Sequence, residues 1–364
     1  MHILVVNVGS SSVKLRVVDD ADDVVATRDL PRLNGPDLVD ALGTLLDESP
    51  GIDVVGHRIV HGGSKFTQPV VLDAGVDEAL ESLSDLAPLH NPPSLEGIHA
   101  LRSLRPRLTQ VACFDTSFHA DMPPKAATYA IPQRWREEWG IRRYGFHGLS
   151  HDWASRRAGV ILGTPREQLR LVTAHLGAGA SLAAVAFGRS VDTTMGFTPM
   201  EGLVMATRSG SVDPGALLWV QRHGALSADQ VEGALEHDSG LRGLSGDTGD
   251  LRQVIASAHA GDALAQLAYD VYVYRIQTNV GAMAAAMDGI DGLVFTGGAG
   301  EASACLRDDV CSGLTFLGLR LETSSNGAHE GDRIVSTGGH LPAVIVVGAR
   351  EDLEIAHGVR DLVG

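Results

Sequence analysis

The stretch ILVVNVGSSSVKLRVVD, residues 3–19, sets a pattern on which the rest of the chain is built. Four apolar residues lead to Asn7, a turn of one glycine and three serines follows, and apolar residues then alternate with polar ones, which predicts a two-stranded hairpin. Gly9 permits a tight turn, and Ser10, Ser11 and Ser12 surround one concavity with N–H and O–H donors that can hold a phosphate. Lys14 adds a positive charge on the returning strand. Taken alone, the stretch is equally compatible with an ordinary N-terminal hairpin.

A second copy of this pattern favours the phosphate-binding interpretation. Residues 171–187, LVTAHLGAGASLAAVAF, form an apolar strand, a polar residue, a glycine-rich turn and a second strand, with His175 in the place of Asn7. Two such hairpins in one chain indicate two related lobes that face each other across a cleft.

A third glycine-rich turn lies in residues 294–301, VFTGGAGE, where an apolar strand leads into a predicted helix. This is a favourable place for the remaining phosphates or the ribose of a nucleotide. None of the three turns ends in Gly-Lys-Ser/Thr or has the full Gly-x-Gly-x-x-Gly spacing, so a Walker A loop and a dinucleotide fingerprint are excluded.

The composition narrows the class of protein. A chain of 364 residues suggests two domains, and a net charge of -16 argues against nucleic acid as a partner. No apolar run approaches the roughly 20 residues of a membrane helix, and we expect neither a signal peptide nor a membrane anchor. Cys113, Cys305 and Cys311 form no C-x-x-C pair, which favours a reducing cytoplasm and no structural zinc.

A short buried strand in residues 52–63, IDVVGHRIVHGG, ends in an arginine, Arg58, next to a double glycine. Ligands of open α/β sheets bind beyond the carboxyl ends of the strands, where a guanidinium can fork onto a carboxylate or phosphate. The alternative is a surface salt bridge. We favour a ligand-binding role for Arg58 over a protein ion pair.

Two further polar residues, like Arg58, follow an apolar stretch or lie next to glycines. Asp115 follows the apolar stretch 111–114, and His147 lies between Gly145 and Gly148, which leave room for a ligand. Histidines are more often structural than catalytic, and we expect His90, His99 and His151 to be so.

These motifs together resemble those of the acetate kinase family, within the superfamily of acetate and sugar kinases, heat-shock chaperones and actin. The matching stretches occur in the family's order from one end of the chain to the other: NVGSSSVK (7–14), GHRIVHGG (56–63), APLHNPP (87–93), FDTSFH (114–119), MPP (122–124), YGFHG (144–148), HLGAGAS (175–181), TTMGFTPMEGL (193–203), TRSGSVDPG (207–215), TGGAGE (296–301) and EDLEIA (351–356).

The resemblance implies reversible, direct in-line transfer of a phosphoryl group from ATP to acetate, which gives acetyl phosphate and ADP. The cofactor is Mg²⁺, for which Mn²⁺ can substitute. The resemblance implies four catalytic residues, Arg58, Asp115, His147 and Arg208, and two metal-binding residues, Asn7 and Glu351. The substrate-binding residues it implies are Arg58, Val60, Leu89, Phe146 and Pro199. The nucleotide-binding residues it implies are Ser10, Ser12, Lys14, His175, Leu176, Gly177, Ala178, Gly179, Asp250, Leu251, Arg252, Gly298, Ala299, Gly300, Glu301 and Ala302.

The residue types suit this chemistry. In-line transfer between two oxygens requires alignment and compensation of charge on the equatorial oxygens, which two arginines, a histidine donor and magnesium provide. Acetate is already ionised at neutral pH, so Asp115 is more plausibly an orienting group than a proton acceptor.

The resemblance also implies an α/β fold of two actin-like, ribonuclease H-like lobes with a nucleotide cleft between them. We assign residues 1–150 and 351–364 to the N-terminal lobe and residues 151–350 to the nucleotide-binding lobe. The family is dimeric, and the run 262–287, with Tyr269, Tyr272, Tyr274 and Met283, is either a dimer surface or an internal core helix.

Other functions remain open at this stage. A kinase of propionate or another short-chain acid would keep these residues and differ in its pocket, whereas a non-catalytic ATPase or scaffold of the superfamily would not need Arg58, His147 and Arg208. Two positions depart from the family pattern, because Ala178 and Arg350 stand where asparagines are usual.

Overall fold

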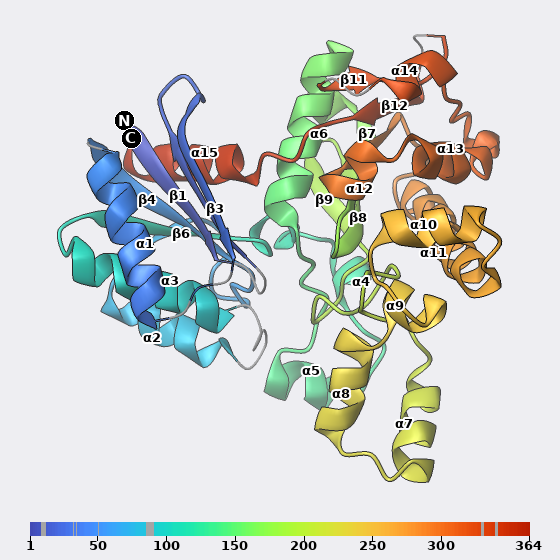
Figure 1. Cartoon of the computed structure of the whole chain (residues 1–364), viewed down its shortest axis with the longest axis horizontal. Coiled ribbons are helices and arrows are strands. Elements are labelled where there is room, and N and C mark those ends of the chain that lie inside the picture. Colours follow the sequence, from blue (N-terminus) through green and yellow to red (C-terminus); the bar gives the residue numbers. More distant parts are fainter. Residues whose placement is uncertain are drawn as a thin grey trace. The chain divides into compact units, whose positions relative to one another are not determined.

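The computed structural model describes residues 1–8, 12–31, 33, 35–49, 51–84, 91–328, 331–338 and 341–364. The chain forms two compact units (Figure 1). Unit 1 consists of Met1–Ala120, Phe146–Trp153 and Arg350–Gly364, and unit 2 consists of Asp121–Gly145 and Ala154–Ala349. Each unit contains a mixed six-stranded sheet with helices, which confirms the predicted α/β class.

The segment 121–145 lies in unit 2, whereas we assigned it to the N-terminal lobe. The reason is a set of hydrogen bonds to the backbone of residues 194–196, which the sequence does not reveal. The backbone N–H of Tyr144 donates to the carbonyl of Gly196 at 3.0 Å, and the guanidinium of Arg143 donates to the carbonyls of Thr194 and Met195, both at 3.0 Å.

The two sheets have the same strand order. In unit 1 the order is β3-β2-β1-β4-β6-β5, and in unit 2 it is β9-β8-β7-β10-β12-β11. The strands are β1 (His2–Val8), β2 (Ser12–Val18), β3 (Val24–Pro31), β4 (Ile52–Ile59), β5 (Val70–Val71), β6 (Thr109–Phe114), β7 (Arg170–Leu176), β8 (Ala180–Ala186), β9 (Arg189–Thr193), β10 (Gly292–Thr296), β11 (Arg333–Ile334) and β12 (Ala343–Val346).

The directions of the strands match as well. Strands β1, β4 and β6 are parallel to one another, as are β7, β10 and β12, and every other pair is antiparallel. The repeat that two hairpins revealed in the sequence therefore extends through six strands in each unit.

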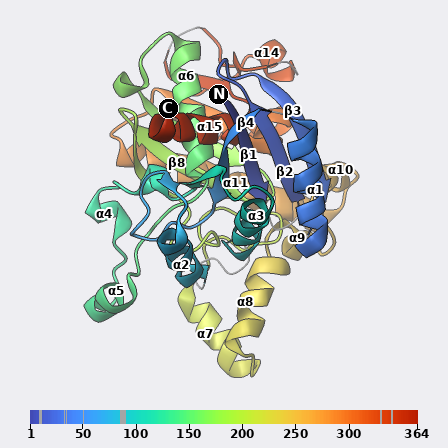
Figure 2. The same cartoon turned by 90° about the vertical axis from the view of Figure 1, so that its left-hand side faces the viewer.

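The sheet of unit 1 is covered on both faces. Helices α1 (Gly35–Glu48) and α3 (Asn91–Leu104) pack on one face through a core that includes Leu4, Leu42 and Leu101. Helix α15 (Glu351–Val363) packs on the other, as Figure 2 shows, and α2 (Ala74–Ser82) adds a smaller core. Gly56 lets α15 approach, because a Cβ there would lie 2.6 Å from Ile355 Cγ2.

Unit 2 carries most of the remaining helices: α4 (Pro124–Ala127), α5 (Gln133–Trp139), α6 (Gly148–Leu162, whose first residues belong to unit 1), α7 (Pro214–His223), α8 (Ala228–His237), α9 (Gly240–Ser245), α10 (Leu251–His259), α11 (Ala263–Ala286), α12 (Gly297–Ala302), α13 (Ala304–Ser312) and α14 (Thr323–Gly327). Short 3₁₀ turns are η2 (Ser117–His119) in unit 1 and η3 (Arg166–Gln168) and η4 (Thr315–Leu317) in unit 2.

Helix α11 packs against β7, β8 and β9. Tyr269, Tyr272 and Met283 are buried in its own unit, so of the four candidates for a dimer surface only Tyr274, 59% exposed, faces outward. Over the described part of the chain, no helix is long and apolar enough to cross a membrane.

Candidate active site

Asn7, Arg58 and Asp115 lie at one edge of the sheet of unit 1. Strands β1, β4 and β6 are parallel, and their register sets Val6 beside His57 and Arg58 beside Cys113, so the three carboxyl ends coincide. Side chains alternate between faces along a strand, and each of the three residues follows a core residue of the α15 face by an even number of positions. All three side chains therefore point to the face that α15 covers.

Arg58 and Asp115 form a two-pronged ion pair at this edge. Arg58 Nε donates to Asp115 Oδ1 at 2.9 Å and Nη2 donates to Oδ2 at 2.6 Å. Arg58 Nη1 lies 3.3 Å from the Oε2 of Glu351, the first residue of α15. The expectation that Arg58 has no protein ion pair is thus wrong: it joins two carboxylates, and the Asp115 side chain is only 2% exposed.

The electrostatics of the pair reflect its burial. Burial raises the pKa of the Asp115 carboxyl, and the charge and hydrogen bonds of Arg58 oppose that rise. Burial disfavours the charged guanidinium, but Asp115 and Glu351 more than compensate and raise the pKa of Arg58 above its ordinary value. The guanidinium of Arg58 therefore stays charged, and the buried Asp115 carboxylate fixes the orientation of its plane.

His147 is attached to the same carboxylate through its backbone. The Asp115 side chain accepts a hydrogen bond from the backbone of His147, and the N–H of Gly148 donates to the Asp115 carbonyl at 2.8 Å. A Cβ at position 148 would lie 2.2 Å from that carbonyl oxygen, so only glycine fits. His147 has φ 55°, in the left-handed region.

Asn7 and Glu351 are an incomplete set of metal ligands. Asn7 pairs across the hairpin with Lys14, which is exposed on the same face. Among the described residues, no group of three or more His, Cys, Asp and Glu side chains is placed to hold a metal. Mg²⁺ commonly uses one or two protein carboxylates together with waters and phosphate oxygens, so these oxygen donors fit a metal that is held jointly with a nucleotide.

The predicted acetate pocket is only partly described. Val60 is half-buried and Phe146 is buried, with its ring edge-on to His61 at a centroid distance of 5.3 Å. Pro199 belongs to unit 2, where its carbonyl accepts a hydrogen bond from Arg208 Nη1 at 2.9 Å. Leu89, like Ser10 of the first phosphate turn, lies outside the described residues.

In unit 2, two of the predicted nucleotide-binding turns lie side by side at the carboxyl ends of β7 and β10. His175 pairs with Thr296, and a Cβ at Gly297 would lie about 3 Å from the backbone of Leu176. Gly297 has φ +78°, a conformation that favours glycine. The buried hydroxyl of Thr296, at this junction, makes no hydrogen bond in the described structure. This edge of unit 2 corresponds to the edge of unit 1 that carries Arg58.

Ala178 is exposed at the tip of the first of these turns. Its carbonyl accepts a hydrogen bond from the N–H of Ala206 at 3.0 Å, and the N–H of Gly177 donates to Gly179 at 2.9 Å. The segment that carries Arg208 is held in turn by a bond from the N–H of Leu241 to the carbonyl of Met205. Burial lowers the pKa of Arg208, against the attraction of Glu236.

Four predicted nucleotide-binding residues make contacts within the protein in unit 2. Asp250 is the N-cap of α10 and pairs with Arg252, which is 88% exposed, while Leu251 is buried. The carboxylate of Glu301 accepts a hydrogen bond from the N–H of Ala349 at 3.0 Å. Beside Gly298 there is open space.

Sequence reasoning missed the residues that shape the loop after β4. The N–H of His61 donates to Asn91 Oδ1 and the Asn91 amide donates back to the His61 carbonyl, both at 3.1 Å. The N–H of Gly62 donates to Thr116 Oγ1. All of these residues lie inside the motifs that match the acetate kinase family, and this was the signal by which the sequence could have revealed them.

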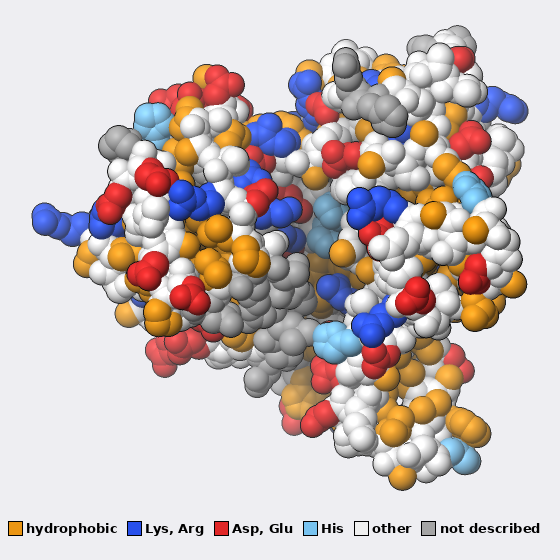
Figure 3. All heavy atoms as spheres, viewed as in Figure 1, with side chains coloured by type: hydrophobic (Ala, Val, Ile, Leu, Met, Phe, Trp, Pro, Cys, Tyr) orange, Lys and Arg blue, Asp and Glu red, His pale blue; other side chains and the backbone are white. Residues whose placement is uncertain are grey.

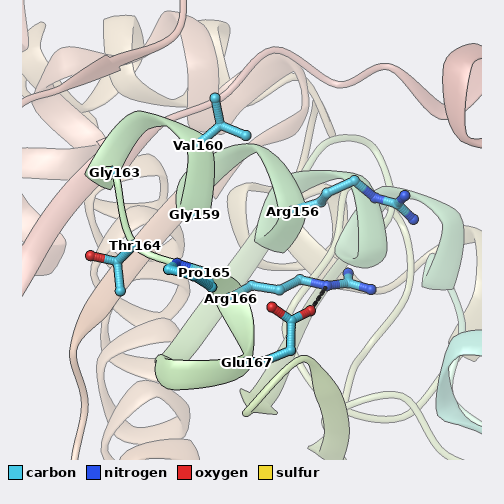
Figure 4. A pocket seen from close by; sticks show the side chains of 8 residues that line it. All are labelled: Arg156, Gly159, Val160, Gly163, Thr164, Pro165, Arg166 and Glu167. Carbon is cyan, nitrogen blue, oxygen red and sulfur yellow. Dashed lines mark hydrogen bonds and ion pairs between the residues drawn. The ribbon is translucent and has the colours of Figure 1, made fainter.

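Unit 2 also has an open hollow of about 420 Å³ between the end of α6 and η3 (Figure 4). Arg156 and Arg166 extend to the same side of it, and Arg166 lies against Glu167. None of the eight lining residues is a predicted site residue.

Comparison with known proteins settles the family. The model of the acetokinase family matches residues 37–357. The chain belongs to this family. An acetate kinase of Synechococcus sp. (strain JA-2-3B'a(2-13)) is 48% identical to it over 320 residues, which are 88% of this chain and 79% of that protein.

Two solved structures match over the full length of both chains. The acetate kinase of Porphyromonas gingivalis has a TM-score of 0.92 at 37% identity, and a propionate kinase from Francisella tularensis has a TM-score of 0.92 at 34% identity. The fold of this acetokinase is therefore that of both enzymes.

Proposed function

We propose that this acetokinase is an acetate kinase, which transfers the terminal phosphoryl group of ATP directly and reversibly to acetate. A carboxylate oxygen of acetate attacks the γ-phosphorus, the bond to the bridging oxygen breaks, and ADP leaves with the electron pair. The products are acetyl phosphate and ADP. The observation that carries the proposal, beside the family, is the buried Arg58–Asp115 pair at the carboxyl ends of parallel strands.

Arg58 has a positioning partner in this reaction. The Asp115 carboxylate occupies Nε and Nη2 of the guanidinium and fixes the plane of the cation, whose Nη1 faces Glu351. Asp115 is oriented toward Arg58 and the backbone of His147, which supports an orienting role for it rather than proton transfer from an already ionised acid.

His147 and Arg208 would compensate the charge that develops on the transferring group, which is where fixed donors lower a barrier most. Asn7 and Glu351 would hold Mg²⁺, which when bound neutralises charge on the nucleotide phosphates. The glycine-rich turns at residues 177–179 and 297–298 would receive the nucleotide.

Propionate is the second candidate substrate, because a propionate kinase shares this fold with a TM-score of 0.92. Val60 and Phe146 offer an apolar contact to either acid. One methylene is worth about 1–3 kcal/mol of discrimination, so we expect preference for acetate rather than exclusion of propionate.

A hydroxamate assay tests the function. Purified chain, ATP and Mg²⁺ are incubated with acetate, propionate or butyrate, and hydroxylamine traps any acyl phosphate. We expect the highest rate with acetate and a loss of signal in Asp115→Asn. Equal absence of hydroxamate for all three acids, with ATP and then with pyrophosphate as donor, would overturn the proposal.

We also propose that two copies of the chain associate, in the cytoplasm. Helices α7 and α8 contain no buried residues, and Leu218, Trp219 and Val220 are 51%, 59% and 42% exposed, over the part of the surface where Figure 3 shows hydrophobic side chains gathered. Three free cysteines agree with a reducing compartment. Light scattering of wild type and Trp219→Glu tests the association, and an unchanged mass would exclude this face.

A further inference from the structure

A cluster of buried rings lies next to His147 in unit 1. His119, on η2, is fully buried and contacts His151 edge-on at a centroid distance of 5.7 Å. His151, also fully buried, lies 6.5 Å from the ring of His147. The rings therefore form a continuous row from the end of β6 to His147.

His119 also holds the backbone that carries His147. Its Nε2 lies 3.1 Å from the carbonyl oxygen of Phe146, the residue before His147. A carbonyl can only accept, so Nε2 carries the proton and donates. Burial lowers the pKa of His119 to about 4, so the ring remains neutral and keeps this tautomer at neutral pH.

The turn needs such support. A non-glycine residue in the left-handed region costs about 1–3 kcal/mol, and His147 has φ 55°. Contacts hold the turn from both ends, because Gly148 bonds to the Asp115 carbonyl and the N–H of His151 donates to the His147 carbonyl at 2.9 Å. The bond from His119 is a side-chain contact to the peptide before His147.

We propose that His119 is a positioning residue, which holds residues 146–148 and through them the imidazole of His147 in the orientation used for phosphoryl transfer. The inference rests on the proposed function of His147. It assigns a mechanistic purpose to a buried histidine that would otherwise be read as a core residue.

Two amide variants separate support from packing. His119→Gln places an amide N–H close to the position of the imidazole Nε2, whereas His119→Asn is polar but too short to reach the Phe146 carbonyl. His57→Asn is the matched control, because His57 is 1% exposed and bonds to Gln110 at 2.7 Å in the same sheet, away from His147.

We expect His119→Asn to lower kcat by about tenfold and to change KM for ATP by less than about twofold. The reason is that a misplaced His147 imidazole loses an interaction made chiefly in the transition state. His119→Gln should recover kcat to within about threefold of wild type, and His57→Asn should lower the melting temperature but not kcat. Equal losses of kcat in the Gln and Asn variants, or losses that follow the melting temperature across all three, would overturn the inference.

A second measurement needs no turnover. The pKa of the His147 imidazole, measured by NMR and assigned with His147→Gln, should be unchanged in His119→Gln and shifted in His119→Asn. An unchanged pKa and ring environment in a folded His119→Asn would overturn the positioning role even if acetate proved not to be the substrate. If His119→Asn does not fold, a shifted pKa of the His147 imidazole in His119→Gln would overturn the inference.

Discussion

At the residue scale, Arg58 is tied to the stability of unit 1 as well as to the chemistry. Its removal would leave the Asp115 carboxylate, 2% exposed, without the cation that offsets its burial. Breaking one side of a buried pair costs about 3–5 kcal/mol, whereas replacing both partners is much less costly.

We therefore predict that Arg58→Ala lowers both turnover and stability, and that Arg58→Ala/Asp115→Asn regains part of the stability but none of the turnover. Urea unfolding and hydroxamate formation measure the two effects. Arg252→Ala is the control, because Arg252 pairs with Asp250 on the surface at 88% exposure, and its removal should leave the urea unfolding midpoint nearly unchanged. Full stability in Arg58→Ala would contradict the structural role of the pair.

At the scale of elements, α15 is fastened to the turn between β2 and β3. His357 Nε2 lies 2.9 Å from Asp22 Oδ2, and Arg360 Nη1 lies 2.6 Å from Asp22 Oδ1. The carboxylate of Glu354, whose Oε2 lies 3.9 Å from His357 Nδ1, and then that of Asp22 raise the pKa of His357 above its ordinary value despite burial. The charged imidazole thus binds this helix to the sheet more strongly than the neutral one.

A raised pKa fixes the direction of the pH dependence. The contribution of His357 is fully present below the pKa of an unfolded histidine, about 6.5, and is lost as pH rises through the higher folded value. We predict that wild type loses about 0.3–1 kcal/mol more stability than His357→Gln between pH 6 and 9. Urea unfolding at several pH values measures this.

The matched control is His223→Gln, since His223 bonds to the carbonyl of Trp219 and has no carboxylate partner among the described residues. It should keep the pH slope of wild type. Parallel slopes for wild type and His357→Gln would show that the imidazole contributes equally in both charge states.

Elements and their ends were predictable because each is signalled locally. Apolar residues followed by polar ones mark the carboxyl-terminal parts of β1, β4 and β6, and so Asn7, Arg58 and Asp115 were found in the sequence. The ion pair between Arg58 and Glu351 was not predictable, because it forms only when α15 packs on the sheet. The N-cap role of Asp250 was missed for a different reason, since an acidic residue before a helix suits both a cap and a ligand.

At the scale of the whole molecule, two sheets of identical strand order carry different residues at corresponding edges. Unit 1 has a buried cation and carboxylates there, and unit 2 has two adjacent glycine-rich turns. We propose that the same framework binds an acid in one half and a nucleotide in the other. The repeat predicts the framework, while the residues at each strand end decide its use.

The two departures from the family pattern lie one in each unit, at Ala178 and Arg350. Arg350 is held by Asp352, with Nε 3.0 Å from Oδ1 and Nη2 3.0 Å from Oδ2. Asp352 thus occupies Nε and Nη2 of this guanidinium and offsets part of its charge, so we expect Arg350→Asn to change the ATP constant by less than about twofold.

Ala178→Asn should restore a side-chain donor at the exposed tip of the turn 177–179 and tighten the binding of ATP. One hydrogen bond is worth about 0.5–1.5 kcal/mol, so the dissociation constant should fall by at most about tenfold. Because Arg350 is engaged with Asp352, we predict that the two effects add. ATP constants of wild type, both single variants and the double variant form the cycle that measures this. A coupling above about 0.5 kcal/mol would mean that Arg350 leaves Asp352 for the phosphates when ATP binds, and that the two departures evolved as one site.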